Sequence, residues 1–212
     1  MADYLYMNCD PIARWYRLFE YLAFGRVLQR RRLEFLDEVM DARSVLILGD
    51  GDGRFTEEFV KRNPQALVES VDLSARMIEL AERRVGSGKV RFRVGDARTI
   101  PLGAKYDLIV THFFLDCFTE SDLDALVARL VGCCELGARW LVSEFGLPVS
   151  GVARVAAGAL IRLMYFFFRM MTGLQITRLP NYSDVFARHG FQVVWKRTVL
   201  GGLLVSEMLE LE

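Results

Sequence analysis

Three glycines and two carboxylates stand where this chain could bind a ligand. Residues 49–53 read Gly-Asp-Gly-Asp-Gly and follow directly on the apolar run 44–48. Glycines at alternate positions allow backbone angles and a close ligand approach that a Cβ atom would block. Asp72 ends the next apolar run, nineteen residues after Gly53, and Asp96 follows a third such run. A carboxylate in the register of Asp72 can accept the hydroxyls of a ribose, so the pattern predicts a ligand that carries one.

The spacing of the glycines argues against a dinucleotide. NAD and FAD sites typically carry a GxGxxG sequence, in which two residues separate the second and third glycines. Here Gly49 and Gly51 are followed by Arg54 at the place of that third glycine. Taken alone, the three glycines could instead form only a tight turn from strand to helix that binds no ligand. Three successive strand ends, each with a glycine turn or a carboxylate, favour a binding site over that alternative.

These residues need secondary-structure elements that bring them to one edge. Short apolar runs typical of buried strands alternate with amphipathic segments typical of helices. The expected strands are 44–48, 67–72, 90–94, 106–112 and 139–145, and the expected helices between them are 56–62, 74–85 and 120–131. This alternation indicates an α/β fold with a doubly wound parallel sheet covered on both faces. The carboxyl ends of its strands would place the glycines and carboxylates side by side.

The two ends of the chain depart from this alternation. Further helices are expected over 10–19, 26–40, 152–171 and 182–189, and two final strands over 191–199 and 203–209. The pair Gly201-Gly202 between the final strands is typical of a hairpin, so the sheet should end in an antiparallel strand. The arginines at 30–32 are balanced by acidic residues nearby and are expected on a solvated face of the second helix.

Composition and charge exclude several classes of function. The chain has 27 basic and 27 acidic side chains, so no surplus of positive charge is available for phosphates, and no nucleic-acid partner is expected. Its four cysteines show neither a CxxC pair nor a histidine at ligand spacing, so no metal site is expected. The first residues lack the basic and apolar regions of a signal peptide, which favours a cytoplasmic protein.

The segment 152–171 is apolar except for Arg154, Arg162 and Arg169. No uncharged run in it reaches the roughly 18 residues that a transmembrane helix needs, so we expect no transmembrane segment. At about 100° per residue the three arginines lie within about 80° of one another, as in an amphipathic helix. A peripheral membrane contact and a homodimer both remain open for this segment.

The GxGxG spacing of Gly49, Gly51 and Gly53 resembles that of the class I S-adenosylmethionine-dependent methyltransferases. The resemblance extends over about residues 44–145 and, more loosely, over the terminal hairpin. It implies a Rossmann-like sheet of seven strands with one antiparallel strand, and S-adenosyl-L-methionine as the cofactor. The cofactor-binding residues that it implies are Gly49, Asp50, Gly51, Asp52, Gly53, Asp72, Leu73, Asp96, Ala97 and Thr111.

The resemblance also assigns roles to these residues. Asp72 would hold the ribose, Leu73 would pack on the adenine, and Asp96 would accept a hydrogen bond from the adenine amino group. Members of the family usually carry an acidic residue two positions before the first glycine, where this chain has Ile47. Asp50 or Asp52 could contact the ammonium group of the cofactor instead.

The family places residues that touch the transferred methyl group and the acceptor just after the fourth strand. His112 stands there and could accept a proton from the acceptor as the catalytic base, or it could be structural. The rings at 113–114 either belong to the core or face the sulfonium, since an aromatic face attracts a cation. The acceptor-contacting residues expected on this basis are Tyr16, Phe113, Asp116 and Tyr165.

Residues 10–17 and the segments 163–168 and 179–191 look like those of the ubiquinone and menaquinone biosynthesis branch of this superfamily, although Arg17 stands where that branch usually has Asp. We therefore expect S-adenosylmethionine-dependent methyl transfer to a small-molecule acceptor, hydrophobic or aromatic, at O, C or N. The alternatives are a non-catalytic S-adenosylmethionine-binding partner subunit and a peripheral lipid-binding protein.

We expect one domain, because no linker, repeat or low-complexity segment divides the chain. Its parts would be an N-terminal helical cap at 1–43, a cofactor-binding core at 44–145, an acceptor-side helical insertion at 146–190 and a C-terminal β-hairpin at 191–212. The cap and the insertion together would cover the methyl group and exclude water from it.

Overall fold

The computed structural model describes residues 20–21, 24–86, 88, 90–103, 105–148, 150–173, 176 and 178–212. The helix expected over 10–19, which includes Tyr16, lies outside the described residues. From Ser44 to Phe145 helices and strands alternate as the sequence predicts. The division of the chain into the four expected parts stays a prediction.

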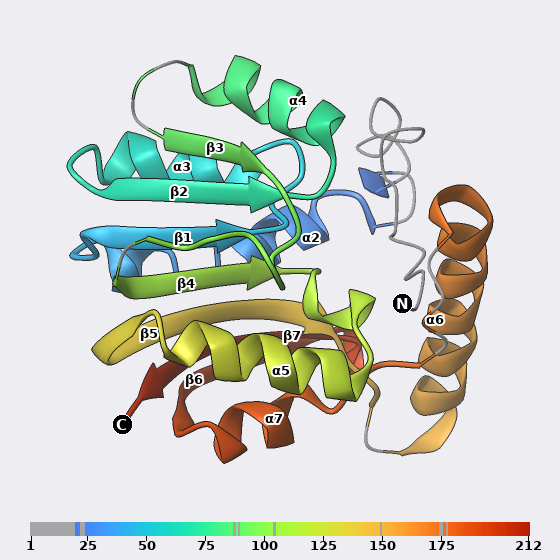
Figure 1. Cartoon of the computed structure of the whole chain (residues 1–212). Helices are drawn as coiled ribbons and strands as arrows, with labels where there is room; N and C mark the ends of the chain where they lie inside the picture. The colour runs from blue at the N-terminus through green and yellow to red at the C-terminus, as the bar shows by residue number, and fades with distance from the viewer. Residues whose placement is uncertain are drawn as a thin grey trace, which may run out of the picture.

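Seven strands form one sheet in the described part of the chain (Figure 1). They are β1 (Ser44–Leu48), β2 (Leu67–Asp72), β3 (Val90–Val94), β4 (Tyr106–His112), β5 (Cys134–Phe145), β6 (Phe191–Val199) and β7 (Leu204–Leu211). Their order across the sheet is β3-β2-β1-β4-β5-β7-β6. β1 to β5 pair in parallel, and β7 runs antiparallel to both β5 and β6. The predicted doubly wound sheet with one antiparallel strand is confirmed.

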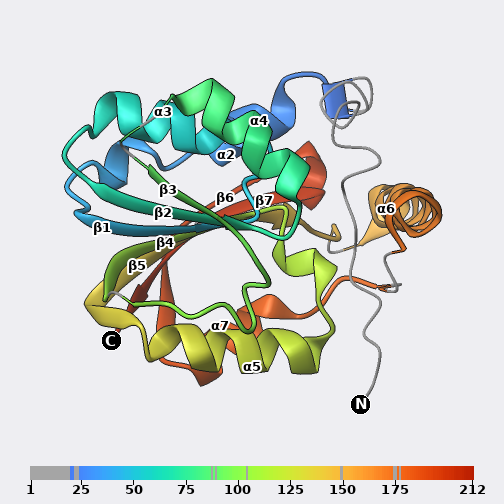
Figure 2. The same ribbon diagram turned by 45° about the horizontal axis from the view of Figure 1, so that its top comes forward.

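Helices cover both faces of the sheet (Figure 2). α2 (Val27–Arg32), α3 (Arg54–Arg62) and α4 (Ala75–Val85) lie on one face, and α5 (Glu120–Val131) and α7 (Tyr182–Arg188) lie on the other. On the first face, Phe55 and Phe59 of α3 are fully buried in the core. On the second, Trp140 of β5 packs edge-on against the rings of Phe186 and Phe191, at 4.7 and 5.4 Å between centroids. Burial on both faces stabilises the strands whose ends carry the predicted site.

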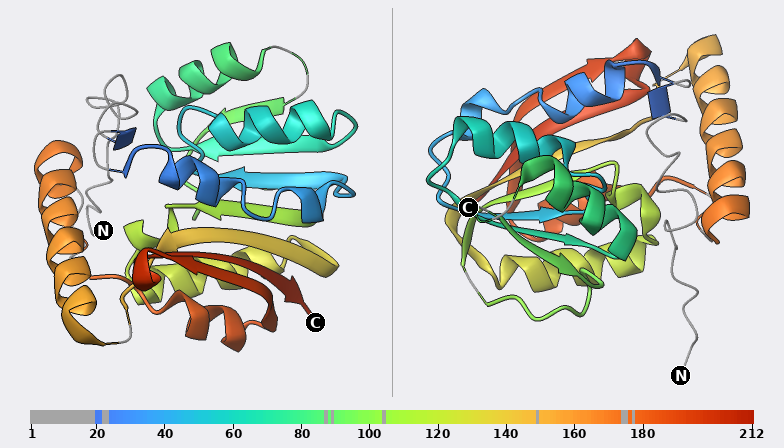
Figure 3. Two further views of the ribbon diagram at one scale, coloured as in Figure 1. Left: turned by 180° about the vertical axis from the view of Figure 1, so that it is seen from behind. Right: turned by 90° about the horizontal axis from the view of Figure 1, so that it is seen from above.

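The helix α6 (Gly151–Thr172) belongs to neither layer. It runs across the carboxyl ends of the parallel strands, as Figures 1 and 3 show. Ala157, Ile161 and Tyr165 on its inner side are buried, in a small cluster that also includes Phe145 and Leu204. The predicted helical insertion therefore stands opposite the edge where the strands end.

The second helix is shorter than expected, and its arginines are not all solvated. α2 ends at Arg32, and the chain then turns into a short 3₁₀ helix, Asp37–Val39. Leu36 and Val39 are fully buried, which directs this segment into the core rather than along a longer helix. The prediction of a solvated face is wrong for Arg32, which is 5% exposed because its guanidinium pairs with Glu20.

Candidate functional site

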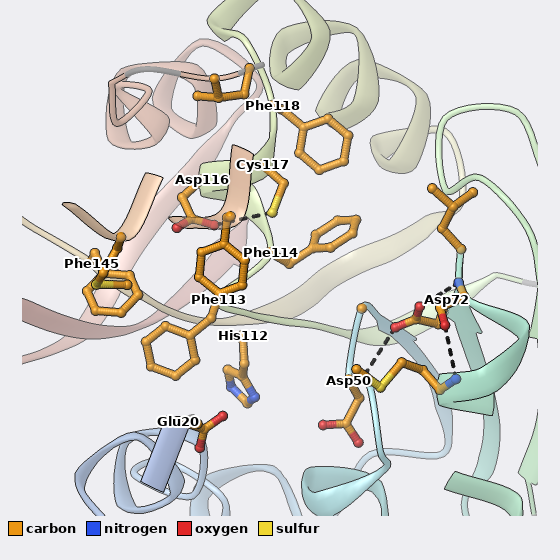
Figure 4. Close-up of a pocket in the computed structure, with 18 of the residues that line it drawn as sticks. Glu20, Asp50, Asp72, His112, Phe113, Phe114, Asp116, Cys117, Phe118 and Phe145 are labelled. Carbon is orange, nitrogen blue, oxygen red and sulfur yellow. Dashed lines mark hydrogen bonds between the residues drawn. The ribbon is translucent and has the colours of Figure 1, made fainter. Parts of the chain in front are cut away.

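A cavity of about 690 Å³ lies at the carboxyl ends of the parallel strands (Figure 4). The loops after β1, β2, β3 and β4 form one part of its wall, and α6 forms another. The predicted site residues that line it are Gly49, Asp50, Gly51, Asp52, Asp72, Leu73, Asp96, Ala97, His112, Phe113, Asp116 and Tyr165. Residues from four separate strand ends and from α6 thus meet around one space.

The loop after β1 depends on glycine for two different reasons. Gly49 lines the cavity with a positive φ of +70°, and a Cβ at this position would overlap the ring of Phe114. Gly53 does not line the cavity and instead precedes α3 as its N-cap residue. A Cβ on Gly53 would come within 2.8 Å of Ala81 of α4. The loop therefore needs glycine for its turn on the cavity side and for helix packing on the other.

Asp72 ends β2 with its carboxylate in the cavity wall (Figure 4). Its Oδ2 accepts a hydrogen bond from the N–H of Gly51 at 3.1 Å, and its Oδ1 accepts from the N–H of Ser74 at 2.9 Å. Ser74 also caps α4, because its Oγ accepts from the N–H of Met77 at 3.1 Å. Asp72 therefore fixes the glycine loop relative to the start of α4, with Leu73 beside it on the cavity wall.

The end of β3 brings a second carboxylate to the same wall. Asp96 accepts from the backbone N–H of Arg98 at 2.9 Å and pairs with its guanidinium at 2.8 Å. Because β2 and β3 are adjacent and parallel, Asp72 and Asp96 follow neighbouring strand ends. Carboxylate oxygens so placed can accept hydrogen bonds from ribose hydroxyls and from an amino group.

Asp50 and Asp52 also line the cavity, but both carboxylates already bind donors of this chain. Asp50 accepts from the N–H and the hydroxyl of Thr56, at 2.9 and 2.7 Å, and so holds the start of α3. Burial raises its pKa. Asp52 pairs with Arg54 at 2.9 Å and with Arg84 at 2.7 Å. A contact from either carboxylate to an ammonium group would compete with these partners.

An ion-pair network that the sequence analysis missed lies on the side of the cavity next to α2. The carboxylate of Glu20 binds two nitrogens of Arg32, both at 2.8 Å, and two nitrogens of Arg54, at 2.7 and 2.8 Å. Burial opposes its charge, but the hydrogen bonds and charges of the two guanidinium groups lower the pKa of Glu20 to about 2. The three residues are 12 and 22 positions apart, so no local pattern could have indicated the network.

His112 is buried in the cavity wall beside Phe55, whose ring lies edge-on with 4.9 Å between centroids. Its Nδ1 has no hydrogen-bond partner among the described residues. Burial, with a smaller contribution from the charge on Arg32, lowers the pKa of His112 to about 3. The imidazole is therefore neutral at pH 7 and a weak base, and its free nitrogen is suited to a hydrogen bond with a ligand or water.

The residues on either side of His112 face in different directions. Thr111 is fully buried away from the cavity, where its Oγ1 accepts from the indole N–H of Trp140 at 2.9 Å. Phe113 has a positive φ of 55°, which is uncommon for a residue other than glycine. Its ring lies 5.0 Å from the guanidinium of Arg32 and lines the cavity, as does the ring of Phe114 (Figure 4).

Two acidic side chains lie near these rings, the half-buried Asp116 and the buried Glu144. Asp116 lines the cavity, its Oδ1 lies 3.5 Å from the Sγ of Cys117, and its backbone carbonyl accepts from the hydroxyl of Tyr165 at 3.2 Å. Glu144 of β5 accepts from the backbone N–H groups at 114–115, at 2.9 and 2.7 Å. Burial raises the pKa of Asp116 to about 6, and burial together with the charge of Asp116 raises the pKa of Glu144 well above its usual value. Glu144 was not predicted as a site residue, because a position within a buried strand indicates only that the residue belongs to the core.

The two ends of the cavity differ in chemistry. We call Gly49, Gly51, Asp72 and Asp96 the polar end. We call the α6 side chains Leu160, Ile161, Met164, Phe167 and Phe168 the apolar end, and apolar side chains of other elements, such as Leu28 and Phe145, also line the cavity. Among the residues that the structure describes, no group of three His, Cys, Asp or Glu side chains could hold a metal ion. The arrangement suits a polar ligand next to an apolar one.

Sequence comparison relates the chain to known methyltransferases. Residues 45–137 match a family described as methyltransferase domain. A malonyl-[acyl-carrier protein] O-methyltransferase of Halalkalibacterium halodurans is 35% identical over 134 residues, which are 57% of this chain and 48% of that relative. A ubiquinone/menaquinone biosynthesis C-methyltransferase of a Caulobacter species is 34% identical over 88 residues, which are 41% of this chain and 34% of that relative. The matches therefore span about half of these relatives' length or less.

Comparison of folds gives a consistent result. Human N-acetylserotonin methyltransferase, solved in complex with SAM, aligns with a TM-score of 0.66 and 16% identity over 92% of this chain and 55% of that one. At this identity the likeness shows the fold, which is the Rossmann-like fold predicted from the sequence. The curated relatives include both O- and C-methyltransferases, so the assignment to the quinone branch stays a prediction.

Proposed function

Because this chain belongs to the class I S-adenosylmethionine-dependent methyltransferases, we propose that it transfers a methyl group from S-adenosylmethionine to a small hydrophobic or aromatic acceptor. The observation that carries this proposal is the single cavity with a polar end at the strand termini and an apolar end on α6. A donor with a ribose and an apolar acceptor would meet at the junction of the two ends.

The polar end fits the cofactor that the family uses. Gly49 and Gly51 would hold its methionine part, since they expose backbone to the cavity without a side chain. Asp72 would accept from the ribose and Asp96 from the adenine amino group, beside Ala97. When bound, S-adenosylmethionine supplies an electrophilic methyl group on a sulfonium.

The chain's own contribution is mainly positioning. The rings of Phe113 and Phe114 line the cavity, and an aromatic face stabilises a nearby cation. Hydrocarbon from α6 excludes water and holds the acceptor against the donor. Alignment of two reactants can supply on the order of 7 to 11 kcal/mol of the barrier, so a methyl transfer needs little further help.

For an acceptor that loses a proton, Asp116 suits the role of base better than His112, which the sequence favoured. A general base is most effective when its pKa lies near the operating pH. The pKa of Asp116 is raised to about 6, whereas that of His112 is lowered to about 3. We assign proton acceptance to Asp116 and a hydrogen bond to the ligand to the Nδ1 of His112.

A non-catalytic partner subunit is the alternative use of the same cofactor site. Such a subunit would bind S-adenosylmethionine and would need no space for an acceptor. The cavity beside His112 continues to the apolar side chains of α6, which favours an enzyme.

Calorimetry with S-adenosylhomocysteine, the demethylated product, tests the proposal. A hydrogen bond to a charged group contributes about 1.5 to 3 kcal/mol, so Asp72→Ala should weaken binding by roughly ten- to a hundredfold. Asp41→Asn is the matched control, because Asp41 is an exposed carboxylate that pairs with Arg139 away from the cavity. Wild-type protein that binds NAD and gives no heat with S-adenosylhomocysteine would refute the proposal.

A further inference from the structure

The face of α6 that points away from the cavity is apolar and exposed. The large apolar side chains of α6 that are at least 64% exposed and do not line the cavity are Val152, Val155, Phe166 and Met170, which are 85, 74, 64 and 70% exposed. At about 100° per residue these four positions lie within about 60° of one another, so they form one stripe along the helix. We call these four residues the outer stripe. No element in the described part of the chain packs against them.

The buried residues of α6 lie on roughly the opposite side of the helix. They are Ala157, Ile161, Tyr165 and Thr172. A helix at the surface of a globular protein normally has one apolar stripe, which packs on the core, and a polar face toward water. α6 therefore has a second apolar face, and an exposed patch of this kind marks an interaction surface.

The charges around this surface have one sign. From Gly146 to Ser183 the sequence contains four arginines and no acidic residue, although the whole chain has equal numbers of basic and acidic side chains. Arg162 and Arg169 are exposed on α6 and lie next to the outer stripe on the helical wheel. The apolar stripe is thus flanked by positive charge.

The combination of an exposed apolar stripe and neighbouring positive charges indicates what kind of partner binds α6. A second copy of the chain would present the same stripe and the same positive charges, so two copies of α6 could form no ion pair with each other. An anionic bilayer offers hydrocarbon for the stripe and negative headgroups for the arginines, as interfacial helices require. We propose that the outer stripe of α6 docks this protein on the surface of a bilayer that contains anionic lipids.

The geometry of α6 sets how it would lie there. With 22 residues it is long and apolar enough, by length and composition, to cross a bilayer. Its inner side chains, however, are buried against the protein, and the hydroxyl of Tyr165 donates to the backbone of Asp116. The helix therefore lies along the membrane surface, with its outer stripe in the interface and its inner side on the cavity.

Docking in this orientation would define the acceptor. The same helix that contacts the bilayer carries the apolar end of the cavity, so a hydrophobic acceptor dissolved in the membrane would reach the site without crossing open water. The acceptor class that follows is an apolar molecule that partitions into lipid. This conclusion about the acceptor rests on the proposed methyl transfer, whereas the docking itself does not.

Flotation of the full chain with lipid vesicles tests the docking. Vesicles of phosphatidylcholine alone are compared with vesicles that also contain phosphatidylglycerol. We expect the wild type to float with the anionic vesicles and much less with the neutral ones. Arg162→Gln/Arg169→Gln should weaken anionic binding by about thirtyfold, since each surface arginine contributes about 1 kcal/mol at such a membrane.

A second pair of variants separates the outer stripe from general surface charge. Phe166→Glu/Met170→Glu should weaken binding at least a hundredfold, because it removes two apolar side chains and adds two negative charges. Leu67→Glu/Leu136→Glu is the matched control, with the same change in charge at two exposed leucines on the strands. The control should float like the wild type, and all variants should keep their circular dichroism and their affinity for S-adenosylhomocysteine.

The outcomes distinguish docking from catalysis. Wild-type protein that binds S-adenosylhomocysteine and does not float with either vesicle overturns the docking alone. Equal flotation of the Phe166→Glu/Met170→Glu variant and the wild type also overturns it. A dimer in light scattering that Phe166→Glu/Met170→Glu converts to a monomer, without vesicle binding, would show that the outer stripe joins two copies. Flotation without any S-adenosylhomocysteine binding would leave the docking in place and refute the proposed function.

Discussion

At the polar end of the cavity the carboxylates are held by neighbouring backbone N–H groups and arginines, whereas the apolar end is hydrocarbon carried by one helix. Asp72 accepts from Gly51 and Ser74, and Asp96 pairs with Arg98. On α6, the hydroxyl of Tyr165 donates to the backbone of Asp116, and the side chains that line the cavity at 160–168 are otherwise apolar. Directional contacts select one ligand geometry, while hydrocarbon selects mainly for size and polarity.

This difference indicates which part of the cavity determines specificity for the donor and which part determines specificity for the acceptor. In the proposed function the polar end recognises the donor, and its groups lie at or just after the ends of strands. The apolar end is on α6, which contacts the core through part of one face. We therefore expect substitutions at the polar side to affect folding and donor binding, and substitutions on α6 to affect the acceptor.

The largest effect should come from the network beside the polar end. Glu20→Gln leaves Arg32 and Arg54 without their shared carboxylate and should lower the free energy of unfolding by about 3 kcal/mol at pH 7. Denaturant titration measures this change. Asp37→Asn is the control, because Asp37 is an exposed partner of Arg62.

The same network predicts a pH dependence. The pKa of Glu20 is lowered to about 2 from 4.5, so its stabilisation is complete above pH 4.5 and is lost as the pH falls toward 2. Stability of the wild type should decline across that window more steeply than stability of Glu20→Gln. Parallel curves for the two proteins would show that Glu20 does not carry this charge interaction.

A substitution at Asp116 should affect catalysis without affecting donor binding. Asp116→Asn should lower turnover of a protic acceptor such as a phenol by about 10²-fold and leave S-adenosylhomocysteine affinity unchanged. Because the pKa of Asp116 is about 6 and the base must be ionised, kcat/KM of the wild type should rise with pH through 6. That limb should be absent in the variant.

The variant His112→Gln tests whether Asp116, rather than His112, is the general base. It should retain turnover within about tenfold, since an imidazole with a pKa of about 3 contributes little as a base. A hundredfold loss in His112→Gln, with normal turnover in Asp116→Asn, would return the role of base to the histidine.

The smallest effect is expected at the apolar end. Met164→Ala should weaken the binding of an apolar fluorescent probe, anilinonaphthalene sulfonate, by about tenfold, because it removes buried hydrocarbon worth about 1 to 2 kcal/mol. Met170→Ala is the matched control on the same helix, since Met170 does not line the cavity. Equal losses in both variants would mean that the probe binds the outer stripe instead.

The polar end was predictable from the sequence because its residues lie at or just after the ends of three successive strands. The apolar run before Asp72, or before the glycines at 49–53, marks the strand, and parallel strands bring their ends together. Glu20, Arg32 and Arg54 were not predictable, because their contact joins three elements that only the tertiary fold brings together. Thr111 and Gly53 were predicted to bind the cofactor, but neither lines the cavity. Thr111 bonds to Trp140 in the core and Gly53 packs against Ala81, and sequence spacing alone does not reveal such orientations.

Hydrogen exchange during stepwise addition of ligands tests the division of the cavity most directly. S-Adenosylhomocysteine alone should increase protection at 49–53 and 72–77 and leave residues 160–168 nearly unchanged. Addition of an apolar acceptor analogue should then increase protection at 160–168. If S-adenosylhomocysteine protects the segment of α6 as strongly as the glycine loop, or protects neither, the assignment of donor and acceptor to separate ends of the cavity is wrong.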